Sequence, residues 1–330
     1  MQVIRVAIVG LVIALLCLGQ SPPPTSAPDP YMLNETFVQG YGYPPNRNTS
    51  GLSLGSQTIN SGIANLVLIV AGQSNIDNFT ESTAYSPTNP TALDNLNIYD
   101  SAIYKAVAPL LGTSFTLENG GSDYVHSGLI LADALVTAGK FARVIIIPVA
   151  IGSTSVADWG GGSAVSGDPA VGLLTTRIPV AIARLTQRGI TCGSTNVTCA
   201  IIWGQGEADN FLSTSAVNYV ASFNNMVTLT AAAGFVGRWF VAKQTYFNGS
   251  ADATVQGAQT NASGSGGVIN NSAGIYLGAN ADALVGNVCN PNHACRFSDN
   301  THFTYNGQVA YATDVTYGWQ QAMHASGAPF

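Results

Sequence analysis

Two residues at opposite ends of the chain have the types and the settings of a nucleophile and its base. Ser74 lies in a Gly-Gln-Ser-Asn segment directly after the apolar run 66–71, and His302 ends an Asp-Asn-Thr-His segment. A serine hydroxyl attacks an ester only when a base accepts its proton, and imidazole titrates near neutral pH. Asp299 lies three residues before His302 and can hold one ring nitrogen in a turn. We therefore predict Ser74 as nucleophile, His302 as base and Asp299 as the orienting acid.

The negative oxygen that forms when serine attacks a carbonyl needs fixed hydrogen-bond donors. The backbone N–H of Ser74 is one candidate. Gly152 follows the apolar run 144–151, and Gln205 follows the run 200–203. Because glycine has no Cβ, the backbone at Gly152 can approach a substrate closely, and Gln205 offers a side-chain amide. Ser74, Gly152 and Gln205 are the predicted oxyanion hole.

Two acids follow Gln205 closely in the chain. Glu207 and Asp209 have the chemistry of a general acid and base, as in a glycosidase. The interpretation that we favour is that Glu207 accepts hydrogen bonds from neighbouring loops and braces the site. Gln73 and Asn75, which flank the nucleophile, are expected to brace the site with it.

Regular elements must position these residues, and the pattern after residue 65 predicts them. Apolar runs predict strands at 66–71, 96–99, 142–150, 199–203 and 236–243, and helical patterns predict helices at 127–138, 171–188, 214–233 and 304–321. Strands that alternate with helices predict a parallel sheet covered on both faces. The carboxyl edge of such a sheet is where chemistry is placed. The Gly/Ser/Asn-rich segment 249–275 predicts a long surface loop.

Charge and the N-terminus limit the partners. The formal net charge is −6 and there is no basic cluster, which disfavours nucleic acid. Arg5 precedes an apolar run over 7–18, too short to span a bilayer comfortably, and Pro-rich residues follow it. We expect a secretory signal peptide and the start of a Pro-rich linker over 1–27, and therefore a secreted or periplasmic protein without stable membrane insertion after cleavage. A retained membrane anchor, or a lipid on Cys17, is the alternative.

Four cysteines follow the expected signal peptide, and an even number in an exported chain predicts disulfides. Of the three pairings available, we favour the local ones, because each closes a short Gly/Asn-rich loop. These are Cys192 with Cys199 and Cys289 with Cys295. A zinc site is the alternative, but the spacings do not match the close cysteine pairs of structural zinc sites, so no metal site is expected.

The four blocks that begin at Gly72, Gly152, Trp203 and Asp299 resemble those of the SGNH hydrolase superfamily, and most closely its branch of sialate O-acetylesterase-like and acetylxylan-esterase-like carbohydrate esterases. The resemblance spans about residues 65–320. It implies a three-layer α/β/α sandwich, flavodoxin-like, with a central parallel sheet, for which the apolar runs predict about five strands. The esterase domain is expected over 63–330. Aromatic residues and glycines without clear periodicity predict an N-terminal arm over 28–62. The family nucleophile falls on Ser74, its acid and base on Asp299 and His302, and an oxyanion glycine on Gly152. Ser153 stands where the family usually has a second glycine.

The sequence therefore predicts a secreted serine esterase that removes O-acetyl groups from a carbohydrate, such as a sialate or xylan-type acetyl ester, through an acyl-enzyme. The expected partner is an acetylated carbohydrate, no cofactor is expected, and the oligomeric state is left open. One alternative is a lipase or arylesterase on the same fold. Another is a non-catalytic carbohydrate-binding protein, which the presence of Ser74, Asp299 and His302 together disfavours.

Overall fold

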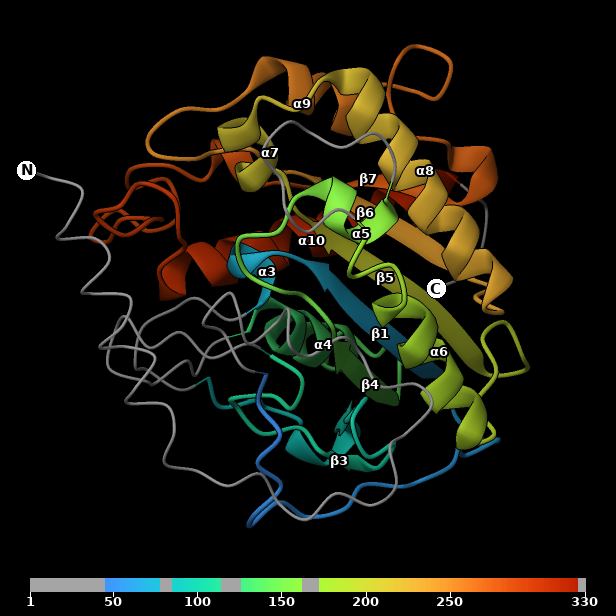
Figure 1. Cartoon of the computed structure of the whole chain (residues 1–330). Coiled ribbons are helices and arrows are strands. Elements are labelled where there is room, and N and C mark those ends of the chain that lie inside the picture. The colour runs from blue at the N-terminus through green and yellow to red at the C-terminus, as the bar shows by residue number, and fades with distance from the viewer. Residues whose placement is uncertain (1–44, 78–84, 114–125, 162–171, 326–330) are drawn as a thin grey trace, which may run out of the picture. The chain divides into compact units, whose positions relative to one another are not determined.

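The computed structural model describes residues 45–77, 85–113, 126–161 and 172–325, all within the unit that spans residues 33–330 (Figure 1). The expected signal peptide and the first part of the expected arm lie outside the described residues. None of the helices in the described part of the chain has the length and hydropathy needed to cross a membrane.

The described residues form one seven-stranded sheet in the order β3-β2-β4-β1-β5-β6-β7. Its strands are β1 (Asn65–Gly72), β2 (Leu93–Leu96), β3 (Ile103–Lys105), β4 (Arg143–Pro148), β5 (Val197–Gly204), β6 (Arg238–Lys243) and β7 (Ile275–Asn280). Neighbouring strands are parallel except β2 and β3, which are antiparallel. The α/β class is confirmed, but the sheet is larger than the five strands expected, and it is mixed.

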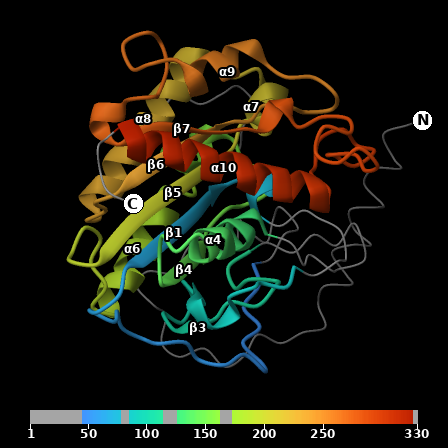
Figure 2. The ribbon, with the colours of Figure 1, turned by 180° about the vertical axis from the view of Figure 1, so that it is seen from behind.

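Helices cover both faces of the sheet. α5 (Val156–Gly160), α6 (Arg177–Gln187) and α8 (Ala216–Ala232) lie on the face toward the viewer in Figure 1, and α4 (Ser127–Thr137) and α10 (Tyr305–Ala325) lie on the face shown in Figure 2. The central strand β1 is apolar throughout because it is buried from both sides. Val67 and Ile69 pack into the core on one face, and Leu66 and Leu68 into the core on the other.

The order of the strands brings three loops together at one edge. β1 pairs with β4 on one side and with β5 on the other, so the chain turns in opposite directions on the two sides of β1. In open α/β sheets, ligands bind at the carboxyl ends of strands at such a switch point. The loops that follow β1, β4 and β5 carry Ser74, Gly152 and Gln205, respectively.

Two predicted elements are displaced in the structure. The strand expected at 96–99 is β2 at Leu93–Leu96, because two buried polar residues extend it toward its N-terminus. Asp94 forms ion pairs with Lys105 and Arg143. Asn95 donates to the Ile146 carbonyl of β4. The helix expected over 171–188 begins only at Arg177, with turns before it, and Pro179 lies in its first turn.

The segment 249–275 is not a plain surface loop, and this prediction was wrong. It contains α9 (Ala253–Thr260), which begins where the Asp252 carboxylate accepts from the backbone N–H groups of Thr254 and Val255. Val255 and Ala258 are fully buried against the core. Ser74 begins the one-turn helix α3 (Ser74–Asp77). The sequence did not predict β3, β7, α5 or α7 (Glu207–Leu212), each of which is no longer than six residues.

Both local disulfides are present in the structure: Cys192 is bonded to Cys199 and Cys289 to Cys295. The first holds the turn that enters β5. The second closes the loop that leads into the segment with Asp299 and His302. Trp159 and Trp203 are buried core residues, and their rings meet edge to face at 5.5 Å.

Candidate active site

Ser74, His302 and Asp299 form a hydrogen-bonded line at the carboxyl edge of the sheet. Ser74 Oγ lies 2.9 Å from His302 Nε2, and His302 Nδ1 lies 2.6 Å from Asp299 Oδ2. With Nδ1 carrying the proton that Asp299 accepts, Nε2 is the lone-pair nitrogen and accepts from the serine hydroxyl. This is the geometry in which imidazole can remove the serine proton.

The Asp299 carboxylate is held ionised. Burial opposes ionisation and is the largest influence. Its effect is outweighed by hydrogen bonds from the His302 side chain and from the backbone N–H groups of Thr301 and His302, and the pKa of Asp299 falls to about 2. A carboxylate with so low a pKa stays negative beside the imidazole and favours the imidazolium that forms during catalysis.

Ser74 begins α3 immediately after β1, and the turn before it requires glycine. Gly72 has φ 133°, and a Cβ there would lie 2.0 Å from the Gly204 carbonyl oxygen of β5. The close approach lets the Gln73 N–H donate to that same carbonyl at 2.9 Å. Gln73 Oε1 in turn accepts from the Ala208 N–H of α7 at 3.1 Å. The loops after β1 and β5 are thus joined directly behind the serine.

Asn75 joins the serine loop to the histidine loop. Its amide nitrogen donates to the Thr301 carbonyl at 2.9 Å and to Glu207 Oε1 at 2.6 Å, and its amide oxygen accepts from the Phe303 N–H at 2.8 Å. Thr301 and Phe303 are the neighbours of His302 on either side. Asn75 is fully buried, so these contacts do not compete with water.

Glu207 is a buried carboxyl inside this group of loops. Burial raises its pKa to about 7, while the hydrogen bond from Asn75 and the charge of Arg296 oppose the rise. Its Oε1 accepts from Asn75 and from Gln244 Nε2 at 3.0 Å. The hydrogen bonds of Glu207 join the loop that carries Asn75 to the residue that follows β6, Gln244.

Gly152 lies in the loop after β4, at the same edge of the sheet as Ser74. The N–H groups of Ser74 and Gly152 make no hydrogen bond to any described residue. Ser153, where the family pattern has glycine, has φ 61°, in the left-handed region that glycine enters freely. The loop therefore keeps the conformation that a glycine pair would take, at some cost in backbone strain.

Gln205 is fully buried, and its amide nitrogen is engaged. It donates to the Thr154 carbonyl at 3.1 Å and, by a short bond, to the Asp209 carboxylate. Asp209 also accepts from the Val156 N–H at 2.9 Å, so the pair ties the loop after β5 to the loop after β4. The amide has two protons, and in this arrangement both are directed to these acceptors.

Two buried residues near the site, Gln244 and Arg296, are not singled out by the sequence, and Asp209 has a contact to Gln205 that the sequence does not predict. Arg296 is buried, donates to the carbonyls of Leu284, Ala281 and Thr301, and lies 4.3 Å from the ring of Phe303. An arginine three residues before a predicted acid is the only signal that the sequence offers for it. Gln244 at the end of β6 had none.

The sequence profile of a family described as carbohydrate esterase, sialic acid-specific acetylesterase, matches residues 64–233. No significant match was found among curated protein sequences. Among solved structures, a protein from Arabidopsis thaliana aligns with 78% of this chain and 98% of its own, at 18% identity and a TM-score of 0.55, which shows a shared fold. NanS aligns with 80% of this chain and 98% of its own at 14% identity and a TM-score of 0.48. A carbohydrate acetylesterase from Xanthomonas citri aligns with 56% of this chain and 43% of its own, at 16% identity and a TM-score of 0.33.

Proposed function

The chain belongs to this family of carbohydrate esterases and is therefore a carboxylic ester hydrolase, and from that premise we propose that it removes O-acetyl groups from a carbohydrate through an acyl-enzyme on Ser74. The observation that carries the mechanism is the alignment of Ser74 Oγ with His302 Nε2 at 2.9 Å. The Asp299 carboxylate on the far side of the ring supports the same assignment.

In the first half of the proposed reaction, His302 Nε2 takes the proton of the Ser74 hydroxyl as Oγ bonds to the acetyl carbon. The carbonyl electrons move to oxygen, and Asp299 stabilises the imidazolium. When the tetrahedral intermediate collapses, the bond to the sugar oxygen breaks. That oxygen takes the proton from His302 and leaves as the free hydroxyl of the sugar.

In the second half, water enters the place that the sugar oxygen has left. His302 removes a proton from the water as its oxygen attacks the acyl carbon. The second intermediate then expels Ser74 Oγ, which recovers its proton from His302. The product is acetic acid, which gives its proton to the solvent and becomes acetate, and the enzyme returns to its starting state.

The oxyanion formed in both halves needs donors, and we assign the backbone N–H groups of Ser74 and Gly152 to that role. Gln205 is the third proposed donor. Because its amide also holds Thr154 and Asp209, this role requires it to turn one proton away from the Thr154 carbonyl. Gln73, Asn75 and Glu207 are proposed to brace the site.

We further propose that the protein acts outside the cytoplasm. Two disulfides support an oxidising compartment, and the apolar run 7–18 supports export. Detection of a mature N-terminus near residue 20 or 28 by mass spectrometry of exported material would support this. An intact N-terminus would contradict it.

Substrate specificity decides between the acetylesterase and a lipase or arylesterase on the same fold. The experiment compares acetate release from acetylated sugars with hydrolysis of acetyl and octanoyl esters, using Ser74→Ala as the control for turnover that does not depend on the site. We expect kcat/KM for acetyl to exceed that for octanoyl by at least about tenfold. Rates that rise with acyl length, with no acetate from any glycan, would favour the lipase.

A further inference from the structure

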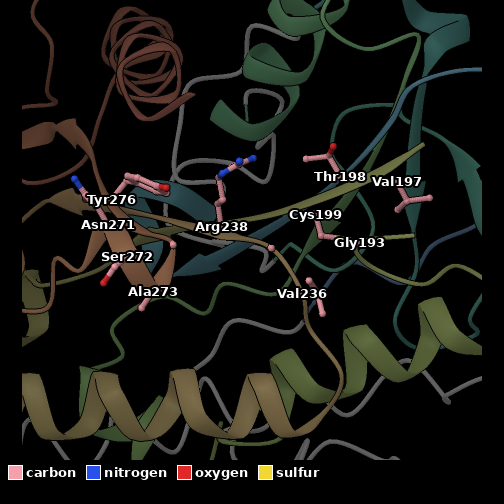
Figure 3. A pocket seen from close by; sticks show the side chains of 12 residues that line it. Gly193, Val197, Thr198, Cys199, Val236, Arg238, Asn271, Ser272, Ala273 and Tyr276 are labelled. Carbon is pink, nitrogen blue, oxygen red and sulfur yellow. The ribbon is translucent and has the colours of Figure 1, made fainter. Parts of the chain in front are cut away.

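A pocket of about 460 Å³ lies at the amino ends of β5, β6 and β7. This is the edge of the sheet opposite the triad. β5 has eight residues, and a strand rises about 3.3 Å per residue, so the two edges are roughly 23 Å apart. The pocket has the volume of a small-ligand site and shares no lining residue with the triad. Its lining includes Thr198, Cys199, Arg238, Asn271, Gly274 and Tyr276 (Figure 3).

Strand register places three polar side chains on one face of the sheet at this pocket. Arg238 of β6 is paired with Ala200 of β5, which shares a face with Thr198 two residues earlier. Phe240, two residues after Arg238, is paired with Tyr276 of β7. Thr198, Arg238 and Tyr276 therefore project from the same face. Figure 3 shows the Arg238 guanidinium between the side chains of the other two.

Arg238 is a half-buried cation without an acidic neighbour in this pocket. The lining contains no aspartate or glutamate, and among the described residues Arg238 has no ion pair or side-chain hydrogen bond. Other arginines of the described part of the chain are occupied differently: Arg143 pairs with Asp94, and Arg177 and Arg296 donate to backbone carbonyls. The planar guanidinium fork matches the two oxygens of a carboxylate.

The remaining lining groups suit hydroxyl groups. Thr198, Asn271 and Tyr276 bring hydroxyl and amide groups, which bond to sugar hydroxyls as donors or acceptors. The pocket is also held in shape. The Cys192–Cys199 disulfide fixes the turn beside it, and the Trp239 N–H donates to the Gly274 carbonyl at 2.8 Å. A preformed pocket loses less entropy on binding.

We infer that this pocket is a second binding site, remote from the triad, for a sugar that carries a carboxylate, with Arg238 holding the carboxylate and the polar lining holding the hydroxyls. Such a site would tether an acidic glycan while the acetylated part reaches the opposite edge. The binding itself does not depend on the esterase reaction, so it is testable whether or not that reaction is as proposed.

The test titrates the full-length ¹⁵N-labelled protein with D-glucuronate, D-glucose and acetate, and follows amide shifts of Gly237 and Gly274. Glucuronate and glucose differ only in the carboxylate, and acetate is a carboxylate without a sugar. We expect glucuronate to shift these two amides and to bind at least about tenfold more tightly than either control. If glucose bound as tightly as glucuronate, Arg238 would not be holding a carboxylate. If acetate bound as tightly, the pocket would not be recognising a sugar.

Arg238→Leu is expected to weaken glucuronate binding by at least about tenfold, whereas Lys140→Leu, which also removes one positive charge but does not line the pocket, leaves it unchanged. Arg238→Lys restores part of the affinity. Unaltered glucuronate binding in Arg238→Leu would refute the inference. If Arg238→Leu fails to fold, the titration of the wild-type protein still tests the inference. Amide shifts of Gly237 and Gly274 that do not change at high glucuronate concentration would equally refute the inference.

Discussion

Replacing Asn75 by aspartate tests whether the contacts between the serine and histidine loops set the position of His302. The two side chains have the same shape, but aspartate lacks the amide protons that Asn75 donates to Glu207 and to the Thr301 carbonyl. Acceptance from the Phe303 N–H is retained. The variant therefore loses the hydrogen bond to Thr301, the residue before His302, and keeps the one from Phe303, the residue after it. No cavity is opened.

The expected loss follows from the contacts. Two buried acceptors each lose one donor, while Gln244 still donates to Glu207 and Arg296 to the Thr301 carbonyl. Each lost hydrogen bond costs about 0.5–1.5 kcal/mol. The new carboxylate also faces Glu207 across a contact that is 2.6 Å in the wild-type protein. Two carboxyl groups so close share one proton. We expect a stability loss of roughly 3 kcal/mol at pH 8, and a smaller loss at pH 5, where one of the pair is protonated.

Urea unfolding at both pH values measures the stability, and kcat on an acetyl ester measures the alignment of His302. Under conditions where the variant is folded, kcat should fall by about 10- to 100-fold, because misplacement of a catalytic group by about 1 Å is enough for that. The double variant Asn75→Asp with Glu207→Gln is the matched control, because the new glutamine amide can donate to the new aspartate. Unchanged kcat in folded Asn75→Asp, or no recovery of stability in the double variant, would refute the reasoning.

Three further predictions concern neighbouring residues. Asp299→Asn should lower kcat by about 10³- to 10⁴-fold, because the ring is held in the wrong tautomer; a silent Asp299→Asn beside a severe Glu207→Gln would show that the acid has been misassigned. Glu207 has a pKa of about 7 in the fold against an ordinary value of 4.5, so its contribution to stability is present below pH 4.5 and is lost as the pH rises through 7. That loss amounts to about 3 kcal/mol, and urea unfolding from pH 4 to 8 should show the slope in the wild type and not in Glu207→Gln. Ser153→Gly should relieve the left-handed backbone at φ 61° and raise stability by up to about 1 kcal/mol, whereas a lower melting temperature would show that the Ser153 side chain contributes contacts that matter more.

The sequence predicts best where burial determines residue type over a whole element. β1 and β4 are buried on both faces, so each is a continuous apolar run that can be recognised without knowing its neighbours. The long helices α4, α8 and α10 have patterns of sufficient length, and Gly139, Gly189 and Gly234 follow helices with positive φ as C-terminal caps do. The approximate positions of the central elements were therefore predictable.

Elements that depend on one specific partner were not predictable in this way. β2 contains Asp94 and Asn95, whose burial is satisfied by Arg143 and by carbonyls of the neighbouring strand. α9 is short and depends on its cap at Asp252 and on two apolar residues that reach the core. In each case the polar residues look like loop residues until their partner, distant in the sequence, is known.

The same reasoning separates the parts of the candidate site. Ser74, Asp299 and His302 were recognisable because each lies in a short segment whose residue types suggest its chemistry. The order of β4, β1 and β5, which brings the three loops to one edge, is known only from the structure. The arrangement of Gln205 was not recognisable, because its amide is directed by Asp209 and by the Thr154 carbonyl of another loop. The residue type at the carboxyl end of a strand indicates which side chain lies near the active site. Whether its protons are available to the substrate depends on acceptors that other strands supply.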